Sequence, residues 1–320
     1  MELFKTLHNR AILEIEIEPV TPLLIKTGDT GGLNVSLPDM QFVRTSTALG
    51  PSVVIPGSSL KGVVRSQAER LLRTDGLWCC DPLDRDDNCG SKVGRGVSVV
   101  YPTQCYACRT FGSTKLGGRA RFTDLLPWSP GMALERKQEA FAAIKTEVRP
   151  GVAIDRRSQS ASGGKLYEIE IVTAGTFYGE ILLTNFQLWQ LGLIGLALQD
   201  IDQGYQQLGS GKSRGLGRVR CRVARAVFES FGPLAGDQAA ADPTLLRGVG
   251  DLGGELVKRY DLTPEDCLSP PDGTAVVEPG VVGRRLKTHK PEAWNGLLEA
   301  LLKSPAWAGF KVPGKGRDRV

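Results

Sequence analysis

The chain has 320 residues, of which 41% are hydrophobic, so it can form one large or two small globular domains. Its 40 Lys and Arg against 35 Asp and Glu give a net charge of +5, which alone argues only weakly for a nucleic-acid partner. No apolar run reaches the ~18 residues of a membrane span. The N-terminal sequence MELFKTLHNR lacks a signal-peptide core, so we expect a cytoplasmic protein without a membrane partner.

The first part of the chain predicts strands around one helix. Residues 11–18 (AILEIEIE) alternate apolar and charged side chains, which is typical of a half-buried strand. Residues 26–52 are rich in Gly, Ser, Thr and Pro and predict a long loop. Residues 60–73 (LKGVVRSQAERLLR) have one apolar face, and Ser58 or Ser59 could cap the helix that they predict.

The middle of the chain returns to strand patterns. Residues 119–125 (RARFTDL) alternate again and predict a strand. Residues 152–183 contain two strand-like runs, and Gly163 and Gly164 provide a turn before their clearest portions.

The last part predicts a buried helix, a strand and a final helix. Residues 186–201 are apolar enough for a helix that packs on a sheet, and residues 217–228 alternate basic and apolar side chains as a strand with one basic face. The Pro and Gly clusters of residues 262–285 indicate loop. Residues 290–304 predict a helix with Pro near its start.

The order of these elements predicts an α+β fold with an antiparallel sheet of ferredoxin-like type. We assign residues 1–232 to this domain, with residues 75–118 as a Cys-rich insertion that has no large core of its own. Residues 233–320 form a C-terminal extension without a recognisable motif. Trp294 and Trp307 could anchor a neighbouring subunit there, although ordinary core packing is the simpler interpretation.

A glycine-rich loop at residues 208–220 (LGSGKSRGLGRVR) can bring backbone N–H groups close to a phosphate. Its GKS triplet resembles part of a nucleotide-binding P-loop, but Gln206 stands where that motif requires glycine, and a strand rather than a helix follows. We therefore favour RNA phosphate over ATP or GTP. The positive charge for this ligand would come from Lys212, Arg214 and Arg218.

Five cysteines within residues 79–108 predict a structural Zn²⁺ site. Cys105 and Cys108 have ligand spacing, and Cys89 with Cys80 completes a tetrahedral set. Cys79 is the alternative to Cys80, and reduced thiols without metal are the other interpretation. Four thiolate ligands leave no open position, so we expect no catalytic role for this metal.

Four segments of the chain together resemble the RAMP superfamily of CRISPR proteins. Residues 54–72 (VIPGSSLKGVVRSQAERLL) resemble its helix-opening motif, and residues 208–219 resemble its C-terminal glycine-rich loop. Residues 152–181 resemble the β-hairpin "thumb" of type III backbone subunits, and residues 119–127 (RARFTDLLP) resemble the strand before it. The segments occur in the family's order and lie within residues 10–225.

The resemblance implies a modified RNA-recognition fold, with a thumb hairpin at residues 150–180, whose copies stack along a CRISPR guide RNA beside other subunits of a ribonucleoprotein. Each thumb would displace one guide–target base pair at regular intervals. The guide contacts that it implies are Ser58, Ser59, Lys61 and Arg65 on the helix, Ile154, Asp155 and Arg156 at the thumb, and Gly209, Gly211, Lys212, Arg214, Gly215, Gly217 and Arg218 in the glycine-rich loop. A plain solvated helix face is the alternative for Lys61 and Arg65.

The resemblance also implies a candidate for target RNA cleavage. Csm- and Cmr-type backbone subunits use a loop aspartate and a divalent cation such as Mg²⁺, and Asp39 in Leu37–Val43 matches that position. The ribose 2′-OH would attack the adjacent phosphate. Asp29 is the runner-up, and an ordinary solvated aspartate is the alternative for both.

Two other roles within the superfamily remain open at this point. A backbone subunit can be a non-catalytic guide-RNA scaffold, in which case Asp39 has no chemical role. A CRISPR RNA-processing endonuclease is less consistent with the sequence, because such enzymes often rely on histidine and neither His8 nor His289 lies near a motif.

Overall fold

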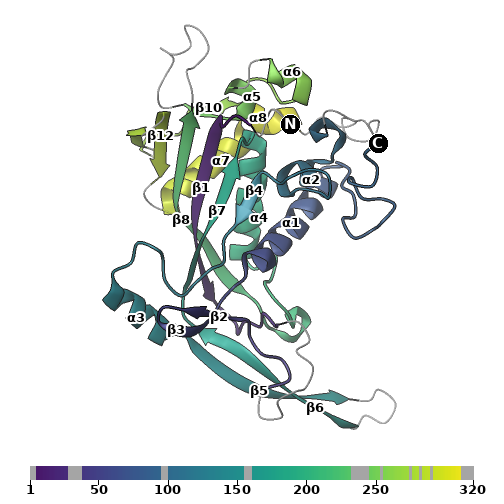
Figure 1. The fold of residues 1–320 in the computed structure, drawn as a ribbon, viewed down its shortest axis with the longest axis vertical. Coiled ribbons are helices and arrows are strands. Elements are labelled where there is room, and N and C mark those ends of the chain that lie inside the picture. Colours follow the sequence, from purple (N-terminus) through teal and green to yellow (C-terminus); the bar gives the residue numbers. More distant parts are fainter. Residues whose placement is uncertain are drawn as a thin grey trace.

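The computed structural model describes residues 5–27, 38–94, 100–154, 161–231, 245–252, 255–273, 276–280, 283–288 and 291–310. Within them, a six-stranded sheet has the order β11-β12-β8-β1-β7-β4, and every neighbouring pair is antiparallel (Figure 1). Its strands are β1 (Asn9–Pro19), β4 (Ala120–Phe122), β7 (Phe177–Thr184), β8 (Val219–Phe231), β11 (Val276–Gly280) and β12 (Gly283–Thr288).

Strand β1 is the centre of the sheet and follows the predicted alternation. It pairs with β7 on one side and with β8 on the other. Ala11, Leu13, Ile15 and Ile17 on its inner face are at most 1% exposed, whereas the charged residues between them are half-buried. One face of the sheet therefore carries the core, and the opposite face is polar.

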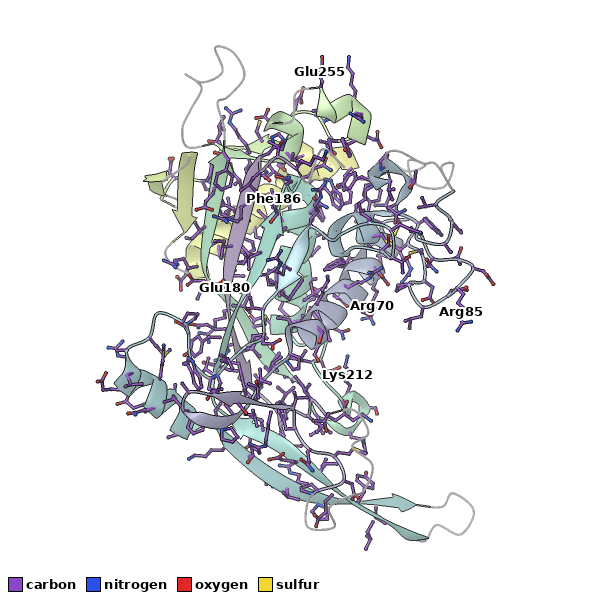
Figure 2. All side chains as sticks on the ribbon, viewed as in Figure 1. Arg70, Arg85, Glu180, Phe186, Lys212 and Glu255 are labelled. Atoms are coloured by element: carbon purple, nitrogen blue, oxygen red, sulfur yellow. The ribbon has the colours of Figure 1, made fainter. Side chains whose placement is uncertain are left out.

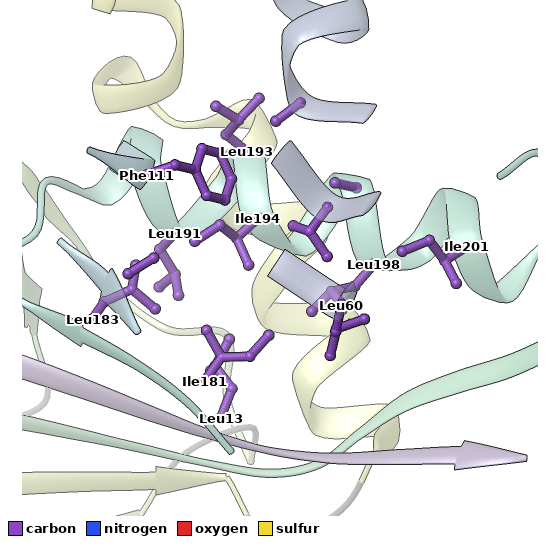
Figure 3. Close-up of a cluster of buried hydrophobic side chains, with 14 of the residues drawn as sticks. Leu13, Leu60, Phe111, Ile181, Leu183, Leu191, Leu193, Ile194, Leu198 and Ile201 are labelled. Atoms are coloured by element: carbon purple, nitrogen blue, oxygen red, sulfur yellow. The ribbon is translucent and has the colours of Figure 1, made fainter. Parts of the chain in front are cut away.

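Three helices cover the apolar face: α1 (Gly57–Thr74), α4 (Leu188–Asp202) and α7 (Pro291–Lys303). Figure 3 shows Leu13 and Ile181 of the sheet facing Leu60 of α1 and Ile194 of α4. Helix α4 is buried on nearly all sides, as its continuous apolar sequence predicts. No helix in the described part of the chain is long and apolar enough to cross a membrane.

Two glycines of α4 allow the C-terminal helices to approach closely. A Cβ atom on Gly195 would lie 2.6 Å from Leu298 of α7, and one on Gly192 would lie 3.0 Å from the ring of Trp307 in α8 (Pro305–Phe310). Trp294 and Trp307 are buried in the main core. Both tryptophans therefore serve core packing in the described structure.

The predicted serine cap of α1 is wrong. Ser58 and Ser59 lie inside the first turn of the helix. The N-cap residue is Pro56, whose side chain makes no capping hydrogen bond. Instead, Oδ1 of Asp124 accepts a hydrogen bond of 2.8 Å from the N–H of Gly57. Gly57 is required here, because a Cβ would lie 2.5 Å from the carbonyl oxygen of Phe122. The cap is a long-range contact that local sequence does not reveal.

A second region projects beyond one end of the main sheet and differs in detail from the prediction (Figure 1). It holds the hairpin of β5 (Lys145–Ile154) and β6 (Ala161–Ala174) and the small hairpin of β2 (Arg44–Thr47) and β3 (Gly50–Val53). Residues 26–52 are thus not all loop. Gly163 and Gly164 lie within β6 rather than at a turn, because glycine also accepts extended backbone. Residues 177–180, predicted as the end of the thumb hairpin, form the start of β7.

The prediction of loop for residues 262–285 is wrong in part. Strand β11 (Val276–Gly280) and the start of β12 lie in this range, and β12 pairs with β8 as an extension of the main sheet. Regular backbone pairing overrides the local preference of Pro279 and Gly280. The C-terminal part of the chain therefore shares its sheet and core with the N-terminal part.

The remaining described elements are short. They are η2 (Tyr101–Thr103), α2 (Tyr106–Phe111), α3 (Leu134–Ala143), η3 (Lys212–Arg214), β9 (Leu246–Arg247), α5 (Val249–Leu252), α6 (Leu256–Tyr260) and β10 (Cys267–Leu268). Asp266, which is fully buried before β10, accepts hydrogen bonds from the N–H groups of Leu188 (2.8 Å) and Gly250 (3.0 Å). This carboxyl fixes the starts of α4 and α5.

The buried carboxyl predicts a pH dependence of stability. Burial raises the pKa of Asp266 to about 7, above the ~3.9 of an unfolded aspartate. The native state thus binds the proton of the Asp266 carboxyl more tightly than the unfolded state does. The contribution of Asp266 to stability is full below about pH 4 and is lost as the pH rises through about 7.

We expect the free energy of unfolding of wild type to fall by a few kcal/mol more than that of Asp266→Asn between about pH 4 and about pH 8. Urea unfolding of both proteins across this range measures the difference. Equal pH slopes would contradict a raised pKa at Asp266, even if Asp266→Asn is less stable throughout because it loses one acceptor.

Candidate functional site

The glycine-rich loop is folded tightly, and its four glycines all have left-handed backbone. Gly209, Gly211, Gly215 and Gly217 have φ between 75° and 87°. A Cβ on Gly209 or Gly217 would lie 2.2 Å from a backbone carbonyl oxygen, whereas one on Gly215 would meet open space. Gly209 and Gly217 are therefore needed first for the close packing of the chain itself.

Only part of the loop can offer N–H groups to a ligand. The N–H of Gly217 donates to the oxygen of Pro22 at 2.9 Å, and that of Gly215 donates to Lys212 at 3.4 Å. Among the described residues, the N–H groups of Gly209, Gly211, Lys212 and Ser213 make no hydrogen bond. These four N–H groups, rather than the whole loop, are thus available to an anion, since that of Ser210 between them donates to Leu24.

Basic side chains from two elements meet beside this loop. The side chain of Lys212 is largely exposed. Its partial desolvation and, to a smaller extent, the positive charge of Arg70 lower the pKa of its ammonium group. Arg70 of α1 donates to Gln206 Oε1 at 3.1 Å, just before the loop. Figure 2 shows Arg70 and Lys212 on the same side of the molecule. Sequence reasoning missed Arg70, although its place five residues after Arg65 on α1 was visible.

The other two predicted basic residues differ in their surroundings. Arg218 is exposed, and its side chain packs near Gly204, where an added Cβ would lie 2.9 Å from Nε. Arg214 is exposed as well, but its Nη1 donates to the hydroxyl of Tyr167 in β6 at 2.7 Å. Arg214 thereby ties the loop to the hairpin.

The predicted RNA-contacting face of α1 divides into two parts. Ser58 is exposed, and Ser59 and Lys61 are half-buried. Burial and then the charge of Arg65 lower the pKa of Lys61. The guanidinium of Arg65 is turned towards the protein, where it donates to Glu69, to the oxygen of Gly112 and to the sulfur of Cys108.

Asp39 lies beside the middle of strand β6 in the β5–β6 hairpin. It is exposed, and its Oδ2 accepts a hydrogen bond of 2.8 Å from the N–H of Glu168. The next residue, Met40, pairs with Ile169 of β6. Asp29, Asp155 and Arg156 fall outside the described residues, and Ile154 is described only as the last residue of β5.

A small apolar cluster joins these three segments. It contains Leu24, Ile169, Ile171 and Leu216, with Met40 and Tyr167 packed against it. Leu216 belongs to the glycine-rich loop, and Met40 follows Asp39 in sequence. Tyr167, Ile169 and Ile171 of β6 belong to the same cluster. The loop, the hairpin and the Asp39 segment therefore share one packing unit, which fixes their relative positions.

Four cysteines come together as predicted. The sulfur atoms of Cys80, Cys89, Cys105 and Cys108 lie within 4.8 Å of one another, and all four residues are buried. The backbone N–H of Cys105 donates to Cys89 at 3.2 Å, and that of Cys108 donates to Cys105 at 3.4 Å. The hydrogen bond between Cys108 and Cys105 lowers the pKa of Cys105 and raises the pKa of Cys108, so the thiols by themselves favour one thiolate at Cys105.

This donor set fits a tetrahedral metal such as zinc, because soft, buried thiolates in a Cys₄ set are typical of structural zinc sites. Cys79 is buried nearby but lies outside the four-sulfur group, which favours Cys80 as the fourth ligand. The cysteines also belong to the main core, in contact with apolar residues of α1 and α2. The segment therefore packs on the main core of the protein, whereas the sequence predicted only that it has no large core of its own.

A family model of the RAMP superfamily matches residues 16–220. This chain belongs to the RAMP superfamily. RAMP proteins are generally associated with CRISPR complexes that bind RNA, so membership implies RNA and CRISPR-complex partners. The match includes α1, the cysteine site, both hairpins and the glycine-rich loop, and it ends at the second residue of β8. No curated protein matches the sequence.

The cysteine geometry predicts one bound metal per chain and identifies its ligands. Protein purified without chelator should contain zinc, and Cys105→Ser or Cys108→Ser should lose most of it and unfold at lower temperature. Cys79→Ser should keep the metal. Elemental analysis of the purified variants measures this. If Cys79→Ser loses zinc and Cys80→Ser retains it, Cys79 rather than Cys80 is the fourth ligand.

Proposed function

We propose that this RAMP protein is a cytoplasmic guide-RNA-binding backbone subunit of a type III CRISPR interference complex, and that Asp39 takes part in cleaving bound target RNA. The observation that supports the proposal best is the shared packing unit. The glycine-rich loop, the β5–β6 hairpin and the Asp39 segment meet at one small apolar cluster. A guide strand held by the loop would therefore lie at a fixed place relative to the hairpin and to Asp39.

The topology supports a ferredoxin-like palm. The elements β1, α1, β4, β7, α4 and β8 occur in this order along the chain, and their strands have the spatial order β8-β1-β7-β4. A strand–helix–strand unit repeated in this antiparallel arrangement is the ferredoxin-like pattern. In this interpretation β5 and β6 are the thumb, inserted between β4 and β7, and Lys145–Ala174 are its bounds.

The proposed guide site combines backbone donors with positive charge. The N–H groups of Gly209 and Gly211 can meet a phosphate oxygen, and Lys212 and Arg70 supply charge beside them. Ser58 and Lys61 would continue this surface along α1. These contacts are to the RNA backbone, so the subunit would hold guides of any sequence.

The proposed cleavage uses the 2′-OH of the target RNA as the nucleophile. Its oxygen bonds to the adjacent phosphorus, the bond to the 5′-oxygen breaks, and the products are a 2′,3′-cyclic phosphate and a 5′-hydroxyl, which receives a proton. Mg²⁺, when bound, would offset charge on the phosphate. Asp39 would hold that ion or accept the 2′-OH proton. Its Oδ2 is engaged with Glu168, and among the described residues its Oδ1 makes no hydrogen bond.

The second candidate function is a non-catalytic scaffold, and one observation favours it. The carboxylate of Asp39 already anchors the segment to β6 through the N–H of Glu168, which is reason enough for an aspartate there. The described residues near Asp39 form no group of three metal-binding side chains. A cation at this site would therefore take most of its ligands from RNA phosphates and water.

The substitution Asp39→Asn separates the two functions. Asparagine keeps a side-chain oxygen for the N–H of Glu168 but loses the negative charge, so the fold and target binding should remain. We expect target cleavage by the guide-loaded complex to fall at least ~10²-fold, as for loss of a general base. Chelation of Mg²⁺ should have a similar effect on wild type.

Glu168→Gln is the matched control, because it neutralises an exposed carboxylate one hydrogen bond away from Asp39. Cleavage of target RNA by the complex that contains Glu168→Gln should remain near that of the wild-type complex. An unchanged cleavage pattern in Asp39→Asn would leave the scaffold role as the function.

The salt dependence of guide binding tests the loop. Lys212→Ala should weaken guide-RNA binding and lower the slope of log affinity against log salt by ~0.7 per lost phosphate contact. Lys303→Ala, which removes an exposed lysine from α7, should change neither. Filter binding at several salt concentrations measures both, and equal slopes for Lys212→Ala and wild type would count against a phosphate contact at Lys212.

A further inference from the structure

Helix α1 presents a ladder of three charged residues to the cysteine site. Arg65, Glu69 and Arg73 are spaced four residues apart, so they lie on one face of the helix. Glu69 is only 8% exposed. Because a carboxylate is rarely buried without charged partners, its two neighbours on the ladder matter. Its Oε1 lies 2.8 Å from Nε of Arg65, and its Oε2 lies 3.6 Å from Nη2 of Arg73.

The two arginines hold opposite parts of the cysteine segment. Nη2 of Arg65 lies 3.4 Å from the sulfur of Cys108, and Nη1 donates to the oxygen of Gly112 at 3.0 Å. Nη2 of Arg73 lies 3.4 Å from the carbonyl oxygens of both Cys79 and Cys80. One end of the ladder thus contacts Cys108 on α2, and the other contacts the backbone of Cys79 and Cys80.

The charges explain why arginines belong there. Four thiolates around a divalent cation leave a net charge of −2, and a buried charge is costly unless it is paired. Arg65, Glu69 and Arg73 together carry +1, which reduces the net charge of the site from −2 to −1, and the contact of Arg65 with Cys108 places positive charge directly on a ligand sulfur. Groups that contact metal ligands in this way orient them and tune affinity for the metal.

We propose that Arg65 and Arg73 are positioning residues for the cysteine metal site, with Glu69 fixing both, and that metal loading thereby orders helix α1. The link to α1 has a functional consequence that rests on the proposed guide-binding function. Ser58 and Lys61 lie on the first turns of the same helix, so metal loading would strengthen guide-RNA binding without contact between metal and RNA.

Cobalt binding to the full-length protein tests the arginine contacts, because Co²⁺ in a tetrahedral thiolate site absorbs visible light. We expect Arg65→Gln to weaken Co²⁺ binding about 10–100-fold and to shift the thiolate-to-cobalt absorption band. Arg65→Lys should be intermediate, since an ammonium keeps the charge but cannot reach three acceptors in fixed geometry.

Arg70→Gln is the control on the same helix, because Arg70 contacts Gln67 and Gln206 rather than the cysteine segment. Its cobalt affinity and spectrum should match those of wild type. Wild-type affinity and an unshifted band in Arg65→Gln would overturn the proposal, as would a wild-type protein that binds no Co²⁺. Arg65→Lys keeps the test decisive if Arg65→Gln does not fold.

Hydrogen exchange tests the link from the metal to α1. Amides of residues 60–74 should exchange more slowly in zinc-loaded than in chelator-treated wild type, and this difference should shrink in the double variant Arg65→Gln/Arg73→Gln. Equal exchange with and without zinc would overturn the ordering of α1.

Guide-RNA binding separates failure of this inference from failure of the proposed function. Zinc-loaded wild type should bind guide RNA more tightly than stripped protein. If binding is equal with and without zinc, the coupling is overturned while the guide-binding function stands. If zinc-loaded wild type binds no guide RNA but Arg65→Gln still weakens Co²⁺ binding, the guide-binding function fails and the arginine contacts to the metal site stand.

Discussion

The docking of helix α1 is the constraint on which the rest of the structure depends. Its apolar face packs on the sheet, and its polar groups reach three other regions. Asp124 after β4 holds its first N–H, Gln67 donates to Asp200 of α4 at 2.6 Å, and Arg65 contacts the cysteine site. The same helix would present Ser58 and Lys61 to RNA. A shift of α1 would therefore disturb the core, the metal site and the proposed guide surface together.

The sequence predicts well what is local and periodic. The alternation of residues 11–18 and the apolar run of 186–201 became β1 and α4, and the Cys-x-x-Cys spacing led to the four-sulfur group. It predicts poorly what depends on distant partners. The cap of α1 comes from Asp124, and the Pro and Gly of β11 are held in a strand by pairing with β12. Both outcomes are decided by tertiary contacts that override local preference.

The candidate site shows the same division. The glycines and basic residues of the loop were visible as a motif, but the backbone geometry leaves only the N–H groups of Gly209 and residues 211–213 open to a ligand. Arg65, predicted to contact RNA, donates to the sulfur of Cys108, a contact that the sequence did not reveal. The four-residue spacing of Arg65, Glu69 and Arg73 was readable from the start. Without the cysteine segment in place, however, nothing distinguished it from an ordinary solvated ladder of ion pairs.

The location of the guide RNA is the most direct test of this account. Ultraviolet crosslinking of guide RNA to the purified complex, followed by mass spectrometry of the peptides, would map it. We expect crosslinks in residues 56–61, at the start of α1, and in the glycine-rich loop at residues 208–218. Crosslinks confined to the polar face of the sheet, around Glu14, Tyr178 and Arg225, would contradict it, because that face lies opposite the helices.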